Sequence, residues 1–393
     1  MTKRDLVDLV RKWVPARARY AIQRVIPVQG LKEEYFAARD PLSAVASGEG
    51  EGPRVGILRN RAQRHTLYVR ACREMGVPFR VIDIEADGWM ERAEASRCAV
   101  FLAWPNATQT PLASATKERC RALQEELGRP VFPGVHEQWM YEDKYRLREW
   151  LMANGVAHPR TWVFLRKADA KAFAETCALP VVFKMGFGAK AAGVKILRSR
   201  KDVRAVVKQA FGRGHAADGF DRRDREWGRV LFQEFIPDAR EWRLVRIGES
   251  YFGHPKGRLG DFHSGSGLVE WDVPEARHLD LLHEVTEKGG FRSMCVDTFE
   301  TPDGRLLVNE LQTVFGASAS VDQMRKDGVA GRMVRSADGA WTFEPGDWAR
   351  NACANERVRY ALGRWGGGAP NGSAAPEAHT ADTATPAATP EPR

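Results

Sequence analysis

Short apolar runs alternate with amphipathic stretches in the segment that begins at Pro53. The runs at 54–58, 79–84 and 99–104 have the length of buried strands. Apolar residues recur at helical spacing in the intervening stretches, and a further short apolar run occupies 130–134. Strands that alternate with helices of this length predict a small open α/β domain with parallel strands, whose strand ends face a ligand crevice.

The pattern changes after Gly134. An amphipathic stretch over 137–155 predicts one helix that ends at Gly155. Between Pro159 and Gln312, apolar runs follow one another, many of them across short turns, which is typical of antiparallel sheets in an α+β region. These runs occupy residues 160–165, 180–185, 193–197, 229–236, 241–248, 250–255, 294–299 and 305–312.

The two ends of the chain differ from its centre. Residues 3–25 carry apolar side chains at helical spacing followed by arginines, as in a basic helix that lies on a membrane surface. A helix docked on its own domain gives the same pattern, and Pro15 interrupts the segment in a way that favours this second interpretation. Beyond Leu362 the composition shifts to Gly, Ala, Pro and Thr, which predicts a disordered tail.

Composition narrows the class of protein. The chain has 393 residues, of which 43% are hydrophobic and 28% charged, as expected for a soluble protein of two to three domains. We expect a cytoplasmic location, because no apolar stretch could span a bilayer and the first residues do not resemble a secretory signal. The six cysteines are scattered, so neither a disulfide framework nor a structural zinc site is indicated.

The net charge of +9 favours an anionic partner such as a nucleotide. The basic runs are not interleaved with aromatic residues for base stacking, so we expect no nucleic-acid partner.

A hairpin at 294–312 carries the most informative polar pattern. With Asp303-Gly304 as a two-residue turn, Asp297 lies directly opposite Glu310, and Gln312 points from the same face. Two facing carboxylates destabilise a sheet unless a cation lies between them, and oxygen ligands of this kind suit Mg²⁺ or Mn²⁺. A three-residue loop at 302–304 would instead place the two acids on opposite faces of an ordinary hairpin.

Two further segments carry candidate chemistry. Lys184 ends an apolar strand that leads into a glycine-rich loop, where backbone N–H groups can approach a phosphate. This loop matches neither the Walker A pattern nor the dinucleotide-binding glycine pattern. The strand at 229–236 ends in extended backbone that can present one carbonyl and one N–H to an adenine edge, and Glu241 beyond it can accept from a ribose hydroxyl.

Taken together and in this order, these elements resemble the ATP-grasp superfamily, in particular its carboxylate-amine ligases such as the D-alanine–D-alanine ligases and the glutamate-ligating enzymes. The resemblance covers residues 130 to about 315, and the α/β region before it is similar to the usual N-terminal domain of that family. It is supported by Gly155, Pro159 and Thr161, which match the family's G-x-x-x-P-x-T.

The resemblance implies an ATP-grasp fold of five parts: an N-terminal basic extension (1–52), an α/β domain (53–135), a lid subdomain (136–237), a C-terminal antiparallel-sheet subdomain (238–362) and the tail (363–393). It also implies roles for single residues. Two lysines would contact the ATP phosphates, three glycines would form the covering loop, three residues would hold adenine, one acid would bind ribose and three residues would bind the metal. In this order they are Lys144 and Lys184; Gly186, Gly188 and Gly193; Gln233, Glu234 and Ile236; Glu241; and Asp297, Glu310 and Gln312.

The chain departs from the family pattern at two places. Gln312 stands where the family has Asn, which puts a second metal ion in doubt, and Cys295 stands where some relatives have an arginine. In those relatives the arginine stabilises an anion of the reaction. In this interpretation Arg243 and Arg258 would do so here, with Lys256 as a substitute for Arg258. The segment 259–271, which contains His263, resembles the loop that closes over substrate.

The resemblance implies an ATP-dependent ligase that uses ATP and Mg²⁺ (or Mn²⁺), forms an acylphosphate and releases ADP and phosphate. Its partners would be a small-molecule carboxylate and an amine or thiol. The substrate would be a small acidic molecule or a precursor of the cell surface. A small-molecule kinase on the same fold and a non-catalytic nucleotide-binding scaffold are the alternatives. A homodimer, and peripheral membrane contact through the N-terminal segment, stay open.

Overall fold

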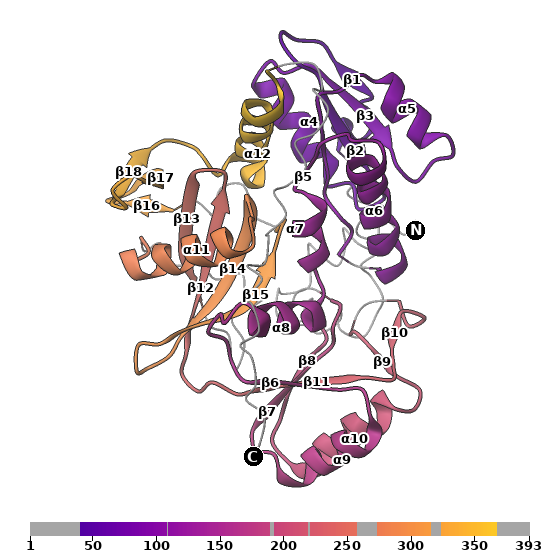
Figure 1. The fold of residues 1–393 in the computed structure, drawn as a ribbon, viewed down its shortest axis with the longest axis vertical. Helices are drawn as coiled ribbons and strands as arrows, with labels where there is room; N and C mark the ends of the chain where they lie inside the picture. The colour runs from indigo at the N-terminus through magenta and orange to yellow at the C-terminus, as the bar shows by residue number, and fades with distance from the viewer. Residues whose placement is uncertain are drawn as a thin grey trace, which may run out of the picture.

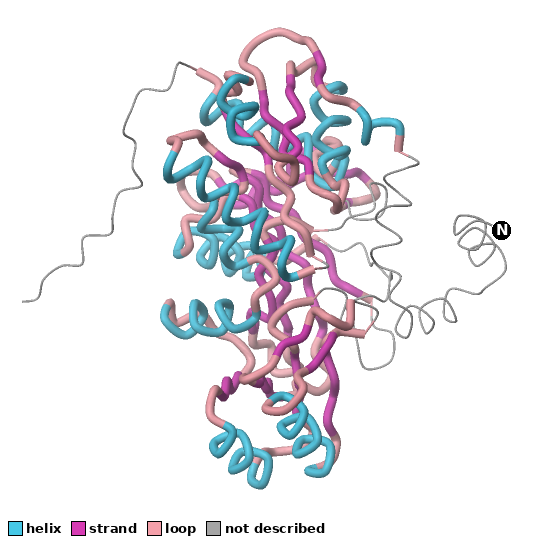
Figure 2. Tube along the Cα trace, turned by 90° about the vertical axis from the view of Figure 1, so that its right-hand side faces the viewer, coloured by secondary structure: helices cyan, strands magenta, loops and turns pink. Residues whose placement is uncertain are grey.

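The computed structural model describes residues 40–107, 109–188, 192–218, 221–257, 273–315 and 324–367. The predicted N-terminal helix, Arg258 and His263 therefore lie outside the described residues. Within these ranges, no helix combines the length and the apolar character needed to cross a membrane. Three parts are stacked along the long axis of the molecule, each built on its own sheet (Figures 1 and 2).

The first part is the predicted open α/β domain. Its sheet has the order β1-β3-β2-β4-β5, with parallel pairing of β2, β3, β4 and β5 and an antiparallel edge strand β1. Helix α4 packs on one face of the sheet, and α5 and α6 pack on the other. The elements are β1 (Ser47–Gly48), β2 (Val55–Arg59), α4 (His65–Glu74), β3 (Phe79–Asp83), α5 (Trp89–Ala95), β4 (Val100–Leu102), α6 (Thr110–Arg121) and β5 (Val131–Phe132).

The single helix expected over 137–155 is two helices, which is a correction. Helix α7 (Val135–Met140) ends before Glu142, whose φ of 53° is left-handed, and α8 (Lys144–Ala153) begins directly afterwards. The Asp143 side chain accepts from the backbone N–H groups of Tyr145 and Arg146 and caps α8. The break therefore places Lys144 in the first turn of a new helix.

The second part is a four-stranded antiparallel sheet at the bottom of Figure 1, with the order β6-β11-β7-β8. Helices α9 and α10 bury their apolar side chains against it. A two-stranded ribbon, β9 with β10, lies beside this sheet. The elements are β6 (Thr161–Phe164), α9 (Lys167–Thr176), β7 (Val181–Lys184), β8 (Val194–Leu197), α10 (Arg200–Ala210), β9 (His215–Ala216), β10 (Arg225–Glu226) and β11 (Val230–Glu234).

The third part is an antiparallel sheet of order β15-β14-β12-β13-β17-β16, with β18 paired to β17. Helices α8 and α11 cover one face, and the start of α12 packs on the other. The elements are β12 (Arg240–Ile247), β13 (Ser250–Lys256), α11 (Ala276–Lys288), β14 (Ser293–Glu300), β15 (Leu306–Gln312), β16 (Arg325–Lys326), β17 (Val329–Arg335), β18 (Trp341–Pro345) and α12 (Arg350–Trp365).

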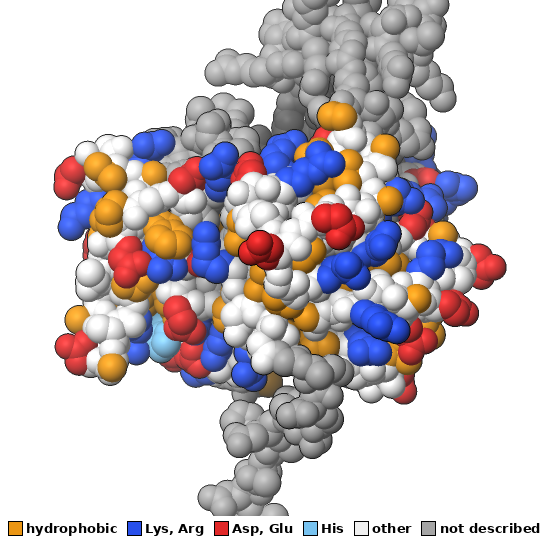
Figure 3. All heavy atoms as spheres, turned by 90° about the horizontal axis from the view of Figure 1, so that it is seen from above, with side chains coloured by type: hydrophobic (Ala, Val, Ile, Leu, Met, Phe, Trp, Pro, Cys, Tyr) orange, Lys and Arg blue, Asp and Glu red, His pale blue; other side chains and the backbone are white. Residues whose placement is uncertain are grey.

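Helix α12 joins the first and third parts. It continues to Trp365, so the chain is still helical three residues into the region expected to be a disordered tail. Its residues Ala354, Val358 and Ala361 enter the apolar core under α4. On the face seen from above, Lys and Arg side chains are interspersed with Asp and Glu rather than gathered in one patch (Figure 3).

Candidate active site

The site is built around the hairpin of β14 and β15. Asp297 pairs directly with Glu310, as the sequence predicts. The turn is not the expected two-residue one: Thr301 N–H donates to the Arg305 carbonyl at 2.9 Å, so the loop is 302–304, with Gly304 at a φ of +82°.

A bulge corrects the register of this hairpin. Thr298 pairs with Val308 whereas Asp297 pairs with Glu310, which leaves Asn309 as one extra residue in β15. A three-residue loop alone would have put the two acids on opposite faces, and the inserted residue reverses this shift. The facing carboxylates therefore depend on Asn309.

Lysines from two other elements converge on this hairpin. The Nζ of Lys144 lies 3.1 Å from Glu310 Oε1 and donates to the Gly188 carbonyl at 3.2 Å. The Nζ of Lys184 donates to Asn309 Oδ1 at 2.7 Å. The first turn of α8, the end of β7, the glycine-rich loop and β15 are thus linked at one point.

The charges of these groups depend on burial and on their partners. Burial alone would raise the pKa of Glu310, but the charges of Lys144, Lys184 and Lys256 together outweigh it, and the pKa of Glu310 is lowered. Burial lowers the pKa of Lys184 to about 8, which leaves the side chain largely protonated at neutral pH. Both groups are therefore charged under ordinary conditions.

A second set of ion pairs holds Asp297. Arg243 Nε lies 3.1 Å from Asp297 Oδ1, and Lys256 Nζ lies 2.5 Å from Asp297 Oδ2. Lys256 also lies 2.7 Å from Glu241 Oε1. Burial opposes the charge of Asp297, but Arg243 and Lys256 prevail and hold the pKa of Asp297 far below its usual value.

Asp297, Glu310 and Gln312, as the structure places them, do not together form a metal site. Both oxygens of Asp297 are engaged by basic side chains, and its side chain is only 1% exposed. No group of three or more His, Cys, Asp or Glu among the described residues is arranged to hold a metal ion. Glu310 and Gln312 offer oxygen donors of the type that Mg²⁺ prefers, whereas Asp297 as placed does not fit the ligand role expected for it.

The remaining expected residues lie around this centre. Gly193 approaches Met185, and a Cβ at Gly186 would lie 2.4 Å from the Tyr145 ring, so the loop packs closely against α8. At the end of β11, the Gln233 amide donates to Thr161, Glu234 accepts from the Arg160 backbone N–H at 2.6 Å, and Ile236 is half-buried. Glu241 is paired with Lys256 and 3% exposed, so its carboxylate is not open to a ribose.

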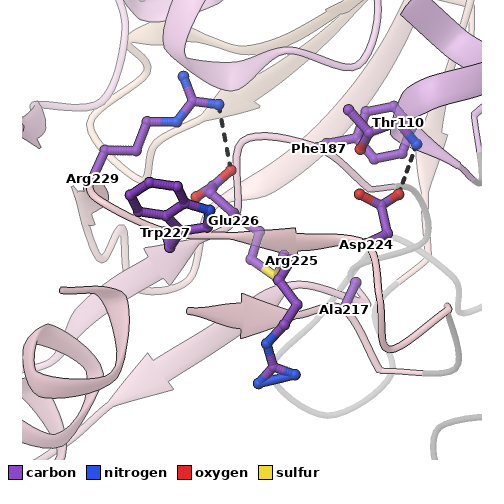
Figure 4. Close-up of a pocket in the computed structure, with 9 residues that line it drawn as sticks. Thr110, Phe187, Ala217, Asp224, Arg225, Glu226, Trp227 and Arg229 are labelled. Atoms are coloured by element: carbon purple, nitrogen blue, oxygen red, sulfur yellow. Dashed lines mark hydrogen bonds and ion pairs between the residues drawn. The ribbon is translucent and has the colours of Figure 1, made fainter. Parts of the chain in front are cut away.

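A cavity of about 280 Å³ lies behind the glycine-rich loop (Figure 4). Glu226 on its wall accepts from Tyr145 OH at 2.7 Å and from the Gly186 N–H at 2.9 Å. Asp224 accepts from the Thr110 N–H at 2.7 Å, which ties the ribbon of β9 and β10 to the first residue of α6. The cavity therefore borders both the loop and the N-terminal domain.

The sequence did not identify several residues at the centre. Glu142 is 5% exposed, burial raises its pKa to about 7, and its Oε2 has no hydrogen-bond partner among the described residues. Asn309 and Glu226 act through a bulge and a long-range contact, for which the local pattern holds no signal. The pair Glu142-Asp143 before Lys144 is the one local hint, because Asp is a preferred N-cap residue and marks a helix start.

The stacked sheets have counterparts among solved structures. The biotin carboxylase domain of a 2-oxoglutarate carboxylase from Hydrogenobacter thermophilus, in complex with MgADP, ADP and bicarbonate, is 16% identical with a TM-score of 0.54. The match covers 80% of this chain and 70% of that one. N5-carboxyaminoimidazole synthetase from Staphylococcus aureus, complexed with ADP, is 13% identical with a TM-score of 0.51, over 70% of this chain and 74% of that one.

The chain has the ATP-grasp fold. The expected fold class is thereby confirmed. A RimK domain protein from Sphaerobacter thermophilus is 21% identical with a TM-score of 0.47, over 66% of this chain and 90% of that one. No family model matches the sequence, and no curated protein matches it either.

Proposed function

We propose that this protein is an ATP-dependent ligase that activates a carboxylate as an acylphosphate and transfers the acyl group to an amine or a thiol. The observation that carries the proposal is the convergence of Lys144, Lys184 and the glycine-rich loop on the Asp297–Glu310 pair. The ATP-grasp fold supports it, since the similar carboxylase and synthetase structures are complexes with ADP.

The described side chains suit phosphoryl transfer. Four basic groups and four carboxylates lie together in this part of the structure, so their charges nearly balance: Lys144, Lys184, Arg243 and Lys256, with Glu142, Glu241, Asp297 and Glu310. Positioning and charge neutralisation are what such a transfer mainly requires of a protein.

In the proposed reaction, an oxygen of the substrate carboxylate attacks the γ-phosphorus and the bond to ADP breaks. The amine or thiol then attacks the acyl carbon, and phosphate leaves. Lys144 and Lys184 would hold the phosphates. To do so, Lys144 would leave its ion pair with Glu310 and bind a phosphate oxygen instead. Arg243 would stay paired with Asp297, so that the guanidinium is already in position before the substrate binds.

ATP would enter as its magnesium complex, and the ion would neutralise part of the phosphate charge. Among the described residues, Glu310 and Gln312 are the oxygen donors that fit it. Asp297 would instead position Arg243 and Lys256. The acceptors would be small molecules, and the reaction would take place in the cytoplasm.

The test is product analysis with Mg-ATP and a panel of amino acids, sugar acids and amines. We expect ADP release that depends on both a carboxylate and a nucleophile, with an amide or thioester detected by mass spectrometry. Glu310→Ala should abolish turnover, whereas Asp303→Ala, an exposed acid at the tip of the same hairpin, should not. A phosphorylated hydroxyl without an amide would identify a kinase, and unchanged turnover in Glu310→Ala would refute the assignment.

A further inference from the structure

Arg357 on α12 is a fully buried cation without a carboxylate partner among the described residues. It is 0% exposed. Its Nε donates to Ser293 Oγ and its Nη1 to the Ala352 carbonyl, both at 2.9 Å. Its Nη2 has no hydrogen-bond partner in the part of the chain that the structure describes. Both acceptors are neutral. The buried carboxylate of Glu137 accepts from the backbone N–H of the same Ser293, not from Arg357, so the guanidinium has no direct ion pair among the described residues.

A second buried arginine, Arg246, has the carboxylate partner that Arg357 lacks. Arg246 is 1% exposed and lies over the Tyr251 ring, and its Nη1 lies 2.6 Å from Glu287 Oε1. Arg357 has two rings instead, those of Trp104 at 5.4 Å and Phe315 at 5.0 Å. Ring faces offset part of the desolvation of a guanidinium, but an arginine cannot discharge itself by losing its proton. A direct anionic partner for the Arg357 guanidinium is the missing element.

The position of Arg357 is that of a ligand site. Trp104 follows β4, and its carbonyl accepts from the Asn60 side chain at the end of β2. The carboxyl ends of parallel strands are where open α/β sheets bind their ligands. Arg357 therefore lies where the ligand edge of the N-terminal sheet meets the third part of the molecule.

The same residue contacts the face of β14 that carries Asp297. Ser293 lies on the face of β14 that carries Asp297, four residues or about 13 Å away. Burial raises the pKa of Tyr141 well above its usual value; Glu310 adds to this shift and Arg357 opposes it. The charges of Glu310 in the candidate active site and of Arg357 therefore both act on Tyr141.

We propose that Arg357 binds a second carboxylate group of the substrate whose first carboxylate is activated, at the remote end of that molecule. The proposal rests on the ligase function and adds to it the class of carboxylate substrate: an elongated molecule with a second acidic group about 10–15 Å from the first. A carboxylate would accept from the free Nη2, between the two rings. Trp104 and Phe315 are 4% and 5% exposed, so the ligand enters by displacing a ring.

The test uses thermal unfolding of the full chain, with sodium glutarate as the carboxylate probe. Sodium chloride at equal ionic strength and sodium phosphate are the comparison salts. Arg357→Met is the test variant, and Arg246→Met is the matched control, since it removes a buried guanidinium that has a counter-ion. Arg357→Lys keeps the charge but loses the planar group.

We expect the free Arg357→Met protein to melt no lower than the natural chain, and Arg246→Met to melt several degrees lower. Glutarate should raise the Tm of the natural chain and of Arg246→Met by about 2 °C or more, with a smaller rise in Arg357→Lys and none in Arg357→Met.

Three results would overturn the proposal: Arg357→Met unfolded or as destabilised as Arg246→Met, equal glutarate shifts in all variants or in none, and a shift with phosphate alone. MgADP binding by calorimetry separates the two proposals. Its retention in Arg357→Met is expected, and its absence from the natural chain would count against the ligase function, not against the anion site.

Discussion

The ion pair between Lys144 and Glu310 permits a quantitative test of the site. Their charged atoms are 3.1 Å apart, and the side chains are 10% and 19% exposed. At an effective dielectric constant of about 20 the attraction is about 5 kcal/mol, and desolvation of the two groups opposes it. We expect a net coupling of about 2 kcal/mol, because each single substitution leaves the other charge buried without its partner.

A double-mutant cycle measures this coupling. Lys144→Met and Glu310→Gln should each lower the free energy of unfolding by about 3 kcal/mol, and the double variant by about 4 kcal/mol rather than the sum. Urea unfolding followed by circular dichroism gives the four values. Additivity to within about 0.5 kcal/mol would show that the pair does not form, and the geometry on which the proposed function depends would be wrong.

Nucleotide binding provides an independent readout of the same pair. With the metal removed by chelator, Glu310→Gln should bind ADP more tightly than the natural chain. The substitution frees Lys144 for a phosphate and removes one negative charge that faces it. Asp303→Asn, on the exposed tip of the hairpin, is the control and should leave the affinity unchanged. Weaker metal-free binding in Glu310→Gln would contradict the exchange of Lys144 between Glu310 and phosphate.

Three further predictions concern the scaffold of the site. Gly186→Ala should destabilise the protein by about 1–3 kcal/mol and weaken ADP binding, because the new Cβ would lie 2.4 Å from the Tyr145 ring; unchanged unfolding and calorimetry would contradict this close packing. Deletion of Asn309 should abolish ADP binding, since the lost bulge shifts the register and the contact with Lys184 disappears, whereas Asn309→Ala should bind more weakly but measurably. The lowered pKa of Asp297 contributes stability that is present above its unfolded pKa of 3.8 and lost as the pH falls below it, so Asp297→Asn should flatten the acid side of the stability profile; a profile as steep as that of the natural chain would argue against the pairing.

Local pattern was sufficient for most of the strands. The predicted pairing of the two acids is confirmed, but it was derived from a two-residue turn, whereas the structure reaches it through a three-residue loop and a bulge. The apolar runs predicted at 180–185, 229–236 and 294–299 coincide with β7, β11 and β14 to within one or two residues, because the period of apolar side chains reflects which face is buried. The prediction of a single helix over 137–155 was wrong, because the apolar spacing does not show the break. The apolar spacing continues through Glu142, whereas the backbone there is left-handed and the Asp143 side chain caps a new helix.

The pairing of charges could not be predicted in the same way. Asp297 was expected to bind a metal, but Arg243 on β12 and Lys256 on β13 reach it first. Whether a carboxylate faces a cation or open space depends on strands that are far apart in sequence and adjacent in the sheet. Arg357 is a similar case, because nothing near it in the sequence indicates that α12 returns to the N-terminal sheet and buries its charge.

The sequence by itself determined the order of the elements, the open α/β domain followed by antiparallel sheets, and the placement of two lysines and two acids in an ATP-grasp pattern. Tertiary structure decided the bulge at Asn309, the start of α8 at Lys144, the ion pairs of Asp297 and the burial of Arg357. The physical reason is range: periodicity records which side of an element is apolar, whereas register, desolvation and charge partners arise only when distant segments pack together.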